Sequence, residues 1–333
     1  MITSPRRAAT VIGVLAGLLL CCTPAWAAEP AVDAAAPKLL LRHKAATVTT
    51  LDIQRFERDY ARWLGYEVRE RGRVSRELAA SWGTPNATGS RYVLLSPDAA
   101  PDVFIRAVQA RSRSNYRALT TWGWNSIEIV VEQTDAVHAR FAASPFRTIG
   151  GPANLGGYPS IRAFQVVGPS QEVLYLTAET GDRANSPLPA PNGDIGRIFI
   201  MVLAGPDIDK MNEFYARAFN LEPGTVRQRP VGVVQNALGL GPEATIGLTT
   251  IRLAQHGNLI ELDGYPSNTG ARQVNTDELP PGIAIASFTV PDLDTIALDL
   301  IAPPRPQSGQ LYGGQRMATA VGPAGELIEL IEE

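Results

Sequence analysis

The stretch DIDKMNEFYARAFNLE, Asp207–Glu222, decides the fold of this 333-residue chain. An apolar run, IFIMVLAG, leads into it, and the carboxylate of Asp207 can accept from the free N–H groups of a first helical turn. Met211, Phe214 and Tyr215 follow at helical spacing, so one face of the helix can pack on a sheet. The sequence therefore predicts a strand followed by an amphipathic helix.

The same stretch occurs earlier in the chain, as DIQRFERDYARWLGYE at Asp52–Glu67, with Asp, Ile, Tyr, Ala, Arg and Glu in register. A second pair of similar segments lies almost the same number of residues apart in the chain as the first pair. These segments are GPSQEVLYL at Gly168–Leu176 and GPAGELIEL at Gly322–Leu330. Similarity at a fixed spacing is the signature of a repeat. The chain is an internal duplication.

Each half contains two segments of the pattern β-α-β-β-β, so the predicted class is α+β. Four such units would form two domains, 44–180 and 196–333, each a curved mixed sheet that encloses a cleft with helices outside. Residues 181–195, rich in Pro, Gly, Asn and Asp, are interpreted as the linker between them. The elements expected in the first unit are Ala45–Leu51, Ser75–Trp82, Ser90–Ser96 and Val103–Val108 as strands and Asp52–Leu64 as the helix. Later helices are expected at Asp135–Ala143 and Asp294–Leu300, and later strands at Ser126–Val131, Ile161–Val167, Val173–Thr177 and Glu326–Ile331.

Residues 1–27 have the pattern of a secretory signal peptide. Arg6 and Arg7 precede an apolar segment, Val11–Cys22, and Ala25-Trp26-Ala27 is a suitable cleavage site. The apolar segment is short for a membrane anchor, so export to the periplasm or the medium is favoured, with 28–43 as a linker. Both cysteines lie within the signal, so the mature chain can form no disulfide and no thiolate metal site.

Composition excludes several classes of function. The chain is 45% hydrophobic and 19% charged, with a net charge of −3, which argues against a nucleic-acid-binding surface. Lysine is nearly absent, which disfavours Schiff-base chemistry. We expect a small-molecule partner, no membrane contact after signal cleavage, and a monomer or homodimer.

The repeat resembles the vicinal oxygen chelate superfamily, which includes glyoxalase I, extradiol dioxygenases and bleomycin-resistance proteins. The resemblance is carried by the turn Val290–Asp294, the segment Asp207–Leu221, and the strand endings at Gly257–Leu262 and Gly325–Leu330. It covers about residues 44–333 and implies the fold rather than the reaction.

In that superfamily, paired units hold one divalent metal through residues at the head of a first strand, commonly His, and on a last strand, commonly Glu. The resemblance places the head positions at Ala45, Ser126, Ile200 and Ile285, and the last-strand positions at Arg106, Tyr175, Glu261 and Glu329. No imidazole stands at any of them, and two carboxylates alone make a poor Zn or Fe site. We therefore expect no metal cofactor, with a hard divalent ion on substitute ligands as the alternative.

The same positions supply the candidate catalytic groups. Arg106, Glu128 and Tyr175 are expected in the N-terminal cleft, where they could hold an anion and move a proton. A purely structural Arg–Glu pair is the alternative. Glu261 and Glu329 are expected to face each other in the C-terminal cleft, where one carboxyl would have a raised pKa. They could also be solvated remnants at the cleft mouth.

Candidate substrate-binding residues are mostly aromatic and would line a pocket in the first domain, although core or sheet-edge packing explains Trp and Tyr equally well. They are Trp82, Tyr92, Trp122 and Trp124, together with Ser126 and the turn residue His256. His256 is placed to assist chemistry, but a single histidine in a turn is more often simply exposed.

The favoured function is that of an exported lyase or isomerase acting on a small aromatic or carboxylate metabolite by side-chain acid–base chemistry. One alternative is a protein that binds or sequesters a small molecule without catalysis. Another is a glyoxalase- or dioxygenase-like enzyme that holds a divalent metal on substitute ligands.

Overall fold

The structure, a computed structural model, describes residues 36–111 and 115–333. The predicted signal peptide 1–27 and residues 28–35 of the predicted linker lie outside the described residues. Within the described part of the chain, no helix has the length and apolar character needed to span a membrane.

The two duplicated helices begin and end as the sequence predicts. In α1 (Ile53–Leu64), Oδ1 of Asp52 accepts a hydrogen bond from the backbone N–H of Arg55 at 2.9 Å. In α4 (Ile208–Phe219), Oδ1 of Asp207 accepts from the N–H of Lys210 at 3.1 Å. Each carboxylate satisfies a donor that has no partner inside the helix, and this is why both helices start at the same motif.

Sixteen strands and three further helices complete the described part of the chain. The other helices are α2 (Arg76–Ser81), α3 (Thr134–Phe141) and α5 (Gly232–Leu238). The strands of units 1 and 2 are β1 (Arg42–Thr50), β2 (Glu67–Arg73), β3 (Arg91–Ser96), β4 (Phe104–Gln109), β5 (Gly123–Val131), β6 (Arg147–Leu155), β7 (Tyr158–Val167) and β8 (Val173–Glu179). Those of units 3 and 4 are β9 (Ile195–Gly205), β10 (Arg227–Arg229), β11 (Ile246–Arg252), β12 (Leu259–Gly264), β13 (Ile283–Val290), β14 (Arg305–Pro306), β15 (Arg316–Val321) and β16 (Leu327–Glu332).

Two local predictions are wrong. The segment Ser75–Trp82 is not a strand but contains helix α2, because Oγ of Ser75 caps its start by accepting from the N–H of Leu78 at 3.0 Å. The missing strand is β2, a largely charged strand at the edge of a sheet, which has little apolar pattern to reveal it. The helix expected at Asp294–Leu300 is only a 3-10 turn, Leu293–Thr295, after which the backbone becomes extended.

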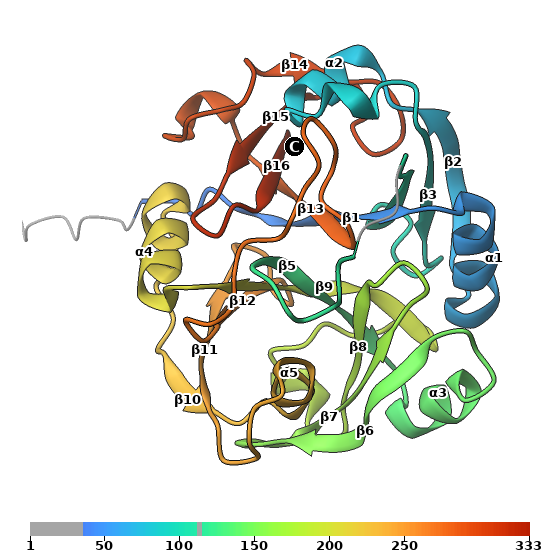
Figure 1. Ribbon diagram of the computed structural model, residues 1–333, viewed down its shortest axis with the longest axis vertical. Helices are drawn as coiled ribbons and strands as arrows, with labels where there is room; N and C mark the ends of the chain where they lie inside the picture. Colours follow the sequence, from blue (N-terminus) through green and yellow to red (C-terminus); the bar gives the residue numbers. More distant parts are fainter. Residues whose placement is uncertain (1–35, 112–114) are drawn as a thin grey trace, which may run out of the picture. The chain divides into compact units, whose positions relative to one another are not determined.

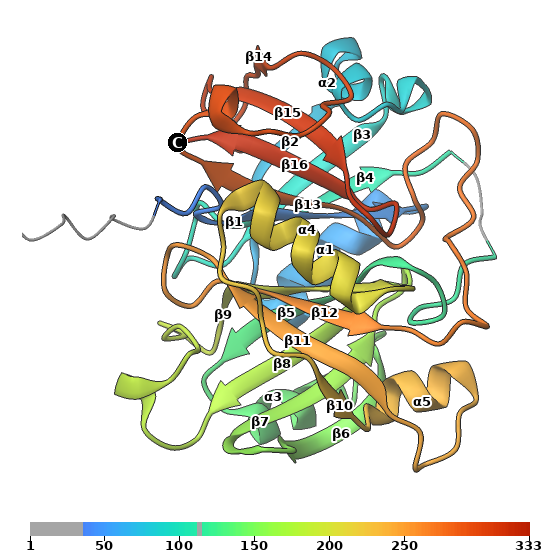
Figure 2. The same cartoon turned by 90° about the vertical axis from the view of Figure 1, so that its left-hand side faces the viewer.

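The strands form two eight-stranded mixed sheets (Figures 1 and 2). Sheet 1 has the order β14-β15-β16-β13-β1-β4-β3-β2, and sheet 2 has the order β10-β11-β12-β9-β5-β8-β7-β6. The first strands of two units meet antiparallel at the centre of each sheet, β1 with β13 and β5 with β9. Sheet 1 therefore joins unit 1 to unit 4, and sheet 2 joins unit 2 to unit 3.

This pairing does not follow the predicted division into domains 44–180 and 196–333, because each sheet takes one unit from each half of the chain. Residues Pro37–Glu333 form one compact unit. The segment 181–195 connects β8 to β9 within sheet 2, and its Leu188 is buried. The first strand of a unit has a free edge that can pair with either neighbour, and the sequence pattern of a unit does not specify which.

The two repeated motifs contact each other and tie the two sheets together. Tyr60 of α1, a helix that packs on sheet 1, places its hydroxyl 3.4 Å from Oε1 of Glu172 in the turn before β8 of sheet 2. In the other half, the hydroxyl of Tyr215 in α4 donates to Oε1 of Glu326 before β16, at 2.8 Å. Burial raises the pKa of both carboxyl groups to about 7. The duplicated tyrosine and glutamate are thus structural partners.

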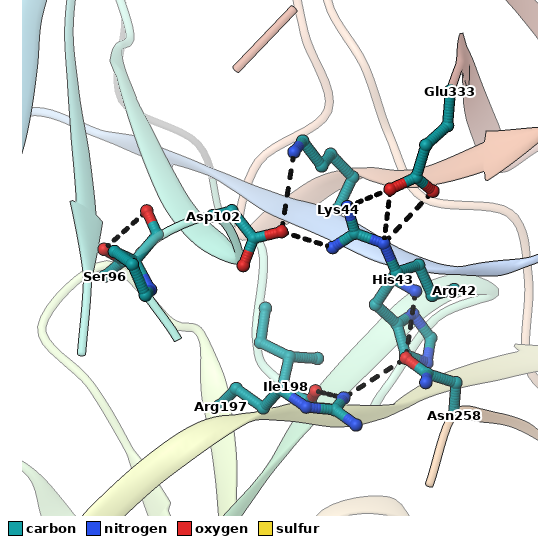
Figure 3. A network of polar contacts seen from close by, with 10 residues as sticks. Arg42, His43, Lys44, Ser96, Asp102, Arg197, Ile198, Asn258 and Glu333 are labelled. Atoms are coloured by element: carbon teal, nitrogen blue, oxygen red, sulfur yellow. Dashed lines mark hydrogen bonds and ion pairs between the residues drawn. The ribbon is translucent and has the colours of Figure 1, made fainter. Parts of the chain in front are cut away.

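A further buried link joins β1 of sheet 1 to β12 of sheet 2 and to Asn258, the residue before β12. Figure 3 shows the part of it that connects His43, Asn258 and Arg197. The ring of His43 is fully buried, and its Nε2 donates to the carbonyl of Leu259 at 2.8 Å. The backbone N–H of His43 donates to Oδ1 of Asn258, which also accepts from Arg197. Burial lowers the pKa of His43 to about 3, so this ring is a neutral structural group.

Candidate functional site

Each sheet has one face covered by helices and one face that bounds a cleft. Alternation along a strand places every second side chain in the cleft, so the last-strand positions identified from the sequence all lie on cleft faces. We call the clefts of sheets 1 and 2 cleft 1 and cleft 2. Side chains fill cleft 1, whereas cleft 2 contains charged groups without an ion-pair partner.

Cleft 1 is centred on a buried ion pair. Nη2 of Arg106 on β4 lies 3.0 Å from Oε2 of Glu329 on β16, and the side chains are 2% and 0% exposed. Nε of Arg106 donates to Oγ1 of Thr47 at 2.8 Å. The guanidinium also donates to the hydroxyl of Tyr312 at 2.5 Å and lies 4.6 Å from the ring centroid of Trp82.

Both oxygens of Glu329 are engaged. Oε1 accepts from Nε1 of Trp82 at 2.7 Å and from the hydroxyl of Tyr312 at 2.9 Å. Oε2 accepts from the hydroxyl of Ser287 at 2.5 Å in addition to Arg106. Helix α2 and Trp82 pack with apolar side chains from six strands of the sheet and fill the remaining space. A fully satisfied network in a filled cleft stabilises a fold but leaves no room for a substrate.

Cleft 2 contains a cluster of carboxyl groups. Glu128 on β5 and Glu261 on β12 lie on the two strands that flank β9, and Asp263 follows two residues after Glu261 on the same face. Glu128 and Asp263 are 6% and 3% exposed, and Glu261 is half-buried. Oε2 of Glu128 accepts from the hydroxyl of Thr177 at 3.3 Å. No ion pair joins any of the three to a cation among the described residues.

The carboxyl groups shift one another's protonation. Burial raises the pKa of Glu261 to about 7. Burial, followed by the negative charges of Glu261 and Asp263, raises the pKa of Glu128 well above its ordinary range. The pKa of Asp263 is raised in the same way, by burial and then by Glu261. At neutral pH the cluster therefore shares protons and can both take up and release them.

Two buried polar atoms of cleft 2 lack partners. Oδ1 of Asp263 and the hydroxyl of Tyr265 are buried and without a hydrogen-bond partner among the described residues. Tyr175 lies beside them on β8, and burial followed by the charge of Asp263 raises its pKa well above its ordinary value. Buried polar groups are rarely left unsatisfied unless another molecule completes them.

Glu128 and Glu261 open onto a cavity of about 150 Å³. Its polar lining includes Glu128, Thr177, Thr250 and Glu261. Its apolar lining comes from the sheet and from the segment that precedes β9, namely Leu155, Tyr158, Ile161, Pro187, Leu188, Phe199, Ile200, Leu248 and Leu259. Three arginines, Arg227, Arg229 and Arg252, complete it at the exposed side. A small cavity with apolar walls and few convergent polar groups is typical of a ligand site.

The superfamily's metal does not fit either cleft. In cleft 1 the guanidinium of Arg106 stands at one position for a ligand, and both oxygens of Glu329 are already engaged. In cleft 2 the corresponding positions hold Ser126, Tyr175, Ile200 and Glu261, which offer one carboxylate and no imidazole. The described residues contain no group of three or more His, Cys, Asp or Glu side chains arranged to hold a metal ion.

The sequence placed most candidate groups on the correct faces but in the wrong combinations. Arg106 does not accompany Glu128 and Tyr175, and Glu261 does not face Glu329. The structure instead brings Arg106 together with Glu329 in cleft 1, and Glu128 with Tyr175 and Glu261 in cleft 2. The physical reason is the pairing of unit 1 with unit 4 and of unit 2 with unit 3.

The aromatic candidates do not form one pocket. Trp82 and Tyr92 lie in or beside cleft 1, and Tyr92 donates to Glu70. Trp124 lies on the helix-covered side, 1% exposed, where Nε1 donates to the carbonyl of Leu327 at 2.8 Å. Trp122 is half-buried, and its Nε1 donates to the hydroxyl of Thr269 at 2.9 Å.

His256 is exposed, and its Nε2 lies 3.0 Å from the carbonyl of Ser186, which it helps to position beside cleft 2. Five charged or phenolic residues of this cleft were not among the candidates from the sequence: Asp263, Tyr265, Arg227, Arg229 and Arg252. Asp263 alone carried a usable signal, because it shares a strand face with Glu261.

A larger cavity, of about 340 Å³, lies on the helix side near the start of α1 and the turn that contains Glu172. Its polar groups are largely used within the fold: Oγ of Ser170 and Oγ1 of Thr50 lie 2.8 Å apart, and Glu172 accepts from the backbone N–H of Ser170 and contacts Tyr60. The equivalent Glu326 and Tyr215 repeat the carboxyl–phenol contact in the other half. Cleft 2 is therefore the stronger candidate site.

Comparison with known proteins agrees with this architecture. No protein-family model matches the sequence, and no curated protein matches it either. Glyoxalase I from Zea mays is similar in structure, with a TM-score of 0.58, 14% identity, and coverage of 87% of this chain and 92% of that chain. A proposed dioxygenase from Bacillus subtilis subsp. subtilis str. 168 has a TM-score of 0.61 at 14% identity, covering 89% of this chain and 86% of that chain. At such identities the similarity shows the fold alone.

Proposed function

We propose that cleft 2 is the active site of an enzyme that acts on a small organic acid. The chain has the vicinal oxygen chelate fold. The reaction would be an isomerisation or an elimination driven by side-chain acid–base chemistry. The single observation that supports it best is the pair Glu128 and Glu261, which open onto one cavity without a cation partner among the described residues.

Glu261 is suited to move a proton. With a pKa of about 7, its carboxyl exists in both protonation states at neutral pH, the condition under which general acid–base catalysis is most efficient. Burial and the charges of Glu261 and Asp263 raise the pKa of Glu128, which favours its protonated form, and in that form it can donate a hydrogen bond to an oxygen that gains negative charge. The two groups then have different roles, set by their environments.

The proposed sequence of events conserves protons. Glu261 removes a proton from a carbon next to the substrate's carbonyl group, and the carbonyl oxygen, now an enolate, accepts a hydrogen bond from Glu128. In an isomerisation Glu261 returns the proton to the other face of the same carbon or to a neighbouring atom. In an elimination the enolate expels a leaving group from the next carbon, and Glu261 delivers the proton to that group.

The remaining walls would hold the substrate. The guanidinium groups of Arg227, Arg229 and Arg252 offer donors for a carboxylate at the exposed side. Apolar side chains such as Ile200 and Leu259 would exclude water from the reacting carbon.

Deuterium exchange tests this proposal without knowledge of the product. The purified protein is incubated in D₂O with a panel of small 2-oxo, 3-oxo and phenolic acids, and exchange at carbon is followed by proton NMR. We expect catalysed exchange for at least one acid, and a loss of 100-fold or more in Glu261→Gln. Glu222→Gln, a change at an exposed carboxylate, is the matched control. Equal exchange by the wild type and Glu261→Gln would refute the role of Glu261.

Two other functions have specific support. The apolar lining of the cavity suits a protein that only binds its ligand, which would give saturable binding with neither exchange nor product. The carboxylates of Glu128 and Glu261 could also hold a hard divalent ion whose remaining ligands are water. Elemental analysis of the purified protein, with activity before and after chelation, separates that case from metal-free chemistry.

We also propose that the protein is exported and acts as a monomer or a homodimer. The proposal of export rests on the pattern of residues 1–27. Intact-mass spectrometry of protein from the periplasm or medium should find a chain beginning at Ala28, and light scattering gives the assembly. A full-length chain retained in the cytoplasm would contradict export.

A further inference from the structure

Cleft 2 carries opposite charges at its two ends. Glu128 and Glu261 line its inner part, and Asp263 lies behind them on the same strand face as Glu261. Arg227 and Arg252 line its outer part and are exposed. The same small cavity thus presents carboxyl groups inside and guanidinium groups outside.

The two sets of charges do not neutralise each other. No ion pair connects the guanidinium groups of Arg227, Arg229 or Arg252 to a carboxylate in residues 36–111 and 115–333. Arg252 is joined to another residue through its backbone carbonyl, which accepts from Nζ of Lys38 at 3.3 Å. Elsewhere the chain pairs buried charge directly, as in Arg106 and Glu329.

Strand geometry explains why the two sets remain apart. Thr250 on β11 lies opposite Glu261 on β12, and Arg252 is the next residue on the same face as Thr250. Two residues along a strand span about 7 Å, so the guanidinium and carboxyl groups occupy successive rows of the cleft. A ligand a few bonds long can reach both rows.

We infer that the ligand of cleft 2 is a zwitterion, which places an ammonium group against Glu128 and Glu261 and a carboxylate against the arginines of the outer rim. The carboxylate end meets arginines that have no ion-pair partner within the described chain. The positive charge of the ammonium end favours the ionised form of Glu261, which also has no cation partner there, while Glu128 can stay protonated. A ligand with only a carboxylate would bring no cation to the inner carboxyl groups. A ligand with only an amine would bring no anion to the arginines. The chemical class is therefore an amino acid in the broad sense, with its two charges separated by a short chain.

Two buried polar atoms of cleft 2 lack a partner, although their residues lie behind the cavity rather than in its lining. Oδ1 of Asp263 is buried and accepts no hydrogen bond from the described residues, and the hydroxyl of Tyr265 is in the same condition. An ammonium group brings three donors and no acceptor, which suits a region rich in carboxyl oxygens.

This inference rests on the proposed use of cleft 2 as the site, but its test does not require turnover. Binding is measured by calorimetry for glycine, β-alanine, 4-aminobutyrate and 5-aminopentanoate, together with analogues that lack one charge. For 4-aminobutyrate these analogues are butyrate, without the ammonium group, and propylamine, without the carboxylate. We expect one amino acid of the series to bind at least ten-fold more tightly than both of its analogues.

Two variants locate the charges. Arg252→Gln should weaken binding of the amino acid by about ten-fold and leave propylamine unaffected, since the lost contact is to the carboxylate. Glu261→Gln should weaken the amino acid and propylamine together and leave butyrate unaffected or tighter. Arg217→Gln, at an exposed position on α4, is the matched control and should change nothing.

Three outcomes would overturn the inference: butyrate binding as tightly as the amino acid, propylamine doing so, or no member of the series binding. If the protein catalyses deuterium exchange in an oxo acid but binds butyrate as tightly as the amino acid, the proposed function stands and the zwitterionic ligand is refuted. If it binds an amino acid tightly but catalyses no exchange in any substrate, the zwitterionic ligand stands and the proposed function is refuted.

Discussion

The guanidinium of Arg106 lies 3.0 Å from the carboxylate of Glu329, although the two residues come from the first and last units of the chain. This contact, with Trp82 and Tyr312, closes cleft 1. The two clefts of the duplicated fold thus differ: cleft 1 holds the fold together, and cleft 2 retains unpaired charge.

Removing one partner of the buried ion pair should destabilise the protein strongly. Arg106→Met leaves Glu329 buried without its cation, and we expect a loss of about 3–5 kcal/mol in the free energy of unfolding, measured with urea. The double variant Arg106→Met with Glu329→Leu should recover much of this loss, because no buried charge remains. Ligand binding in cleft 2 should persist while the variant is folded. A loss below about 1 kcal/mol would show that cleft 1 is not closed by this pair.

Glu261 should make stability depend on pH in a defined direction. Its folded pKa of about 7 lies above the unfolded value, so the folded state binds more protons between about pH 4.5 and 7. Its contribution to stability is fully present below about pH 4.5 and is lost as the pH rises through 7. Glu261→Gln should therefore match the wild type at pH 4.5 and exceed it at pH 8. The gain should not exceed about 2 kcal/mol, because Glu261 keeps some contact with solvent.

Chemical denaturation of both proteins across this pH range measures the effect, with Glu222→Gln as a control that should show none of it. A variant less stable than the wild type at pH 8 would mean that ionised Glu261 has a cation partner in the folded protein.

The duplicated tyrosines should contribute similar amounts to stability in the two halves. Tyr60→Phe and Tyr215→Phe each remove a hydroxyl that contacts a buried glutamate, Glu172 or Glu326, and each should cost about 1–3 kcal/mol. The two sites are in different halves, so the double variant should lose close to the sum. Thermal unfolding of the two single variants and the double variant tests this. A cost for only one tyrosine would contradict the equivalence of the two motifs.

The sequence predicted the helix starts and the strand faces, because both depend on interactions between residues that are close together in the chain. Asp52 and Asp207 identify the helix starts because capping involves only the next few residues. Strand alternation placed Glu128 and Glu261 on cleft faces for the same kind of reason. The charged edge strand β2 was missed because it buries little apolar surface.

The composition of each cleft could not be predicted, because it depends on which units pair. Arg106 and Glu329 are far apart in the chain, and nothing near either residue indicates that β1 pairs with β13. One consequence is that the predicted linker 181–195 supplies Leu188 to the wall of cleft 2 rather than separating two domains. Non-local pairing, not local structure, decided which charges were neutralised.

Methyl NMR tests most directly whether the ligand binds in cleft 2 and not in cleft 1. Isoleucine and leucine methyl groups are labelled, and 4-aminobutyrate and its homologues are titrated into the protein. We predict that signals of Ile161, Ile200 and Leu259 in cleft 2 shift with saturation, while those of Leu94, Ile285 and Leu311 in cleft 1 stay unchanged. Saturable shifts confined to cleft 1 would contradict the account, and the absence of any saturable shift would contradict the inferred zwitterionic ligand.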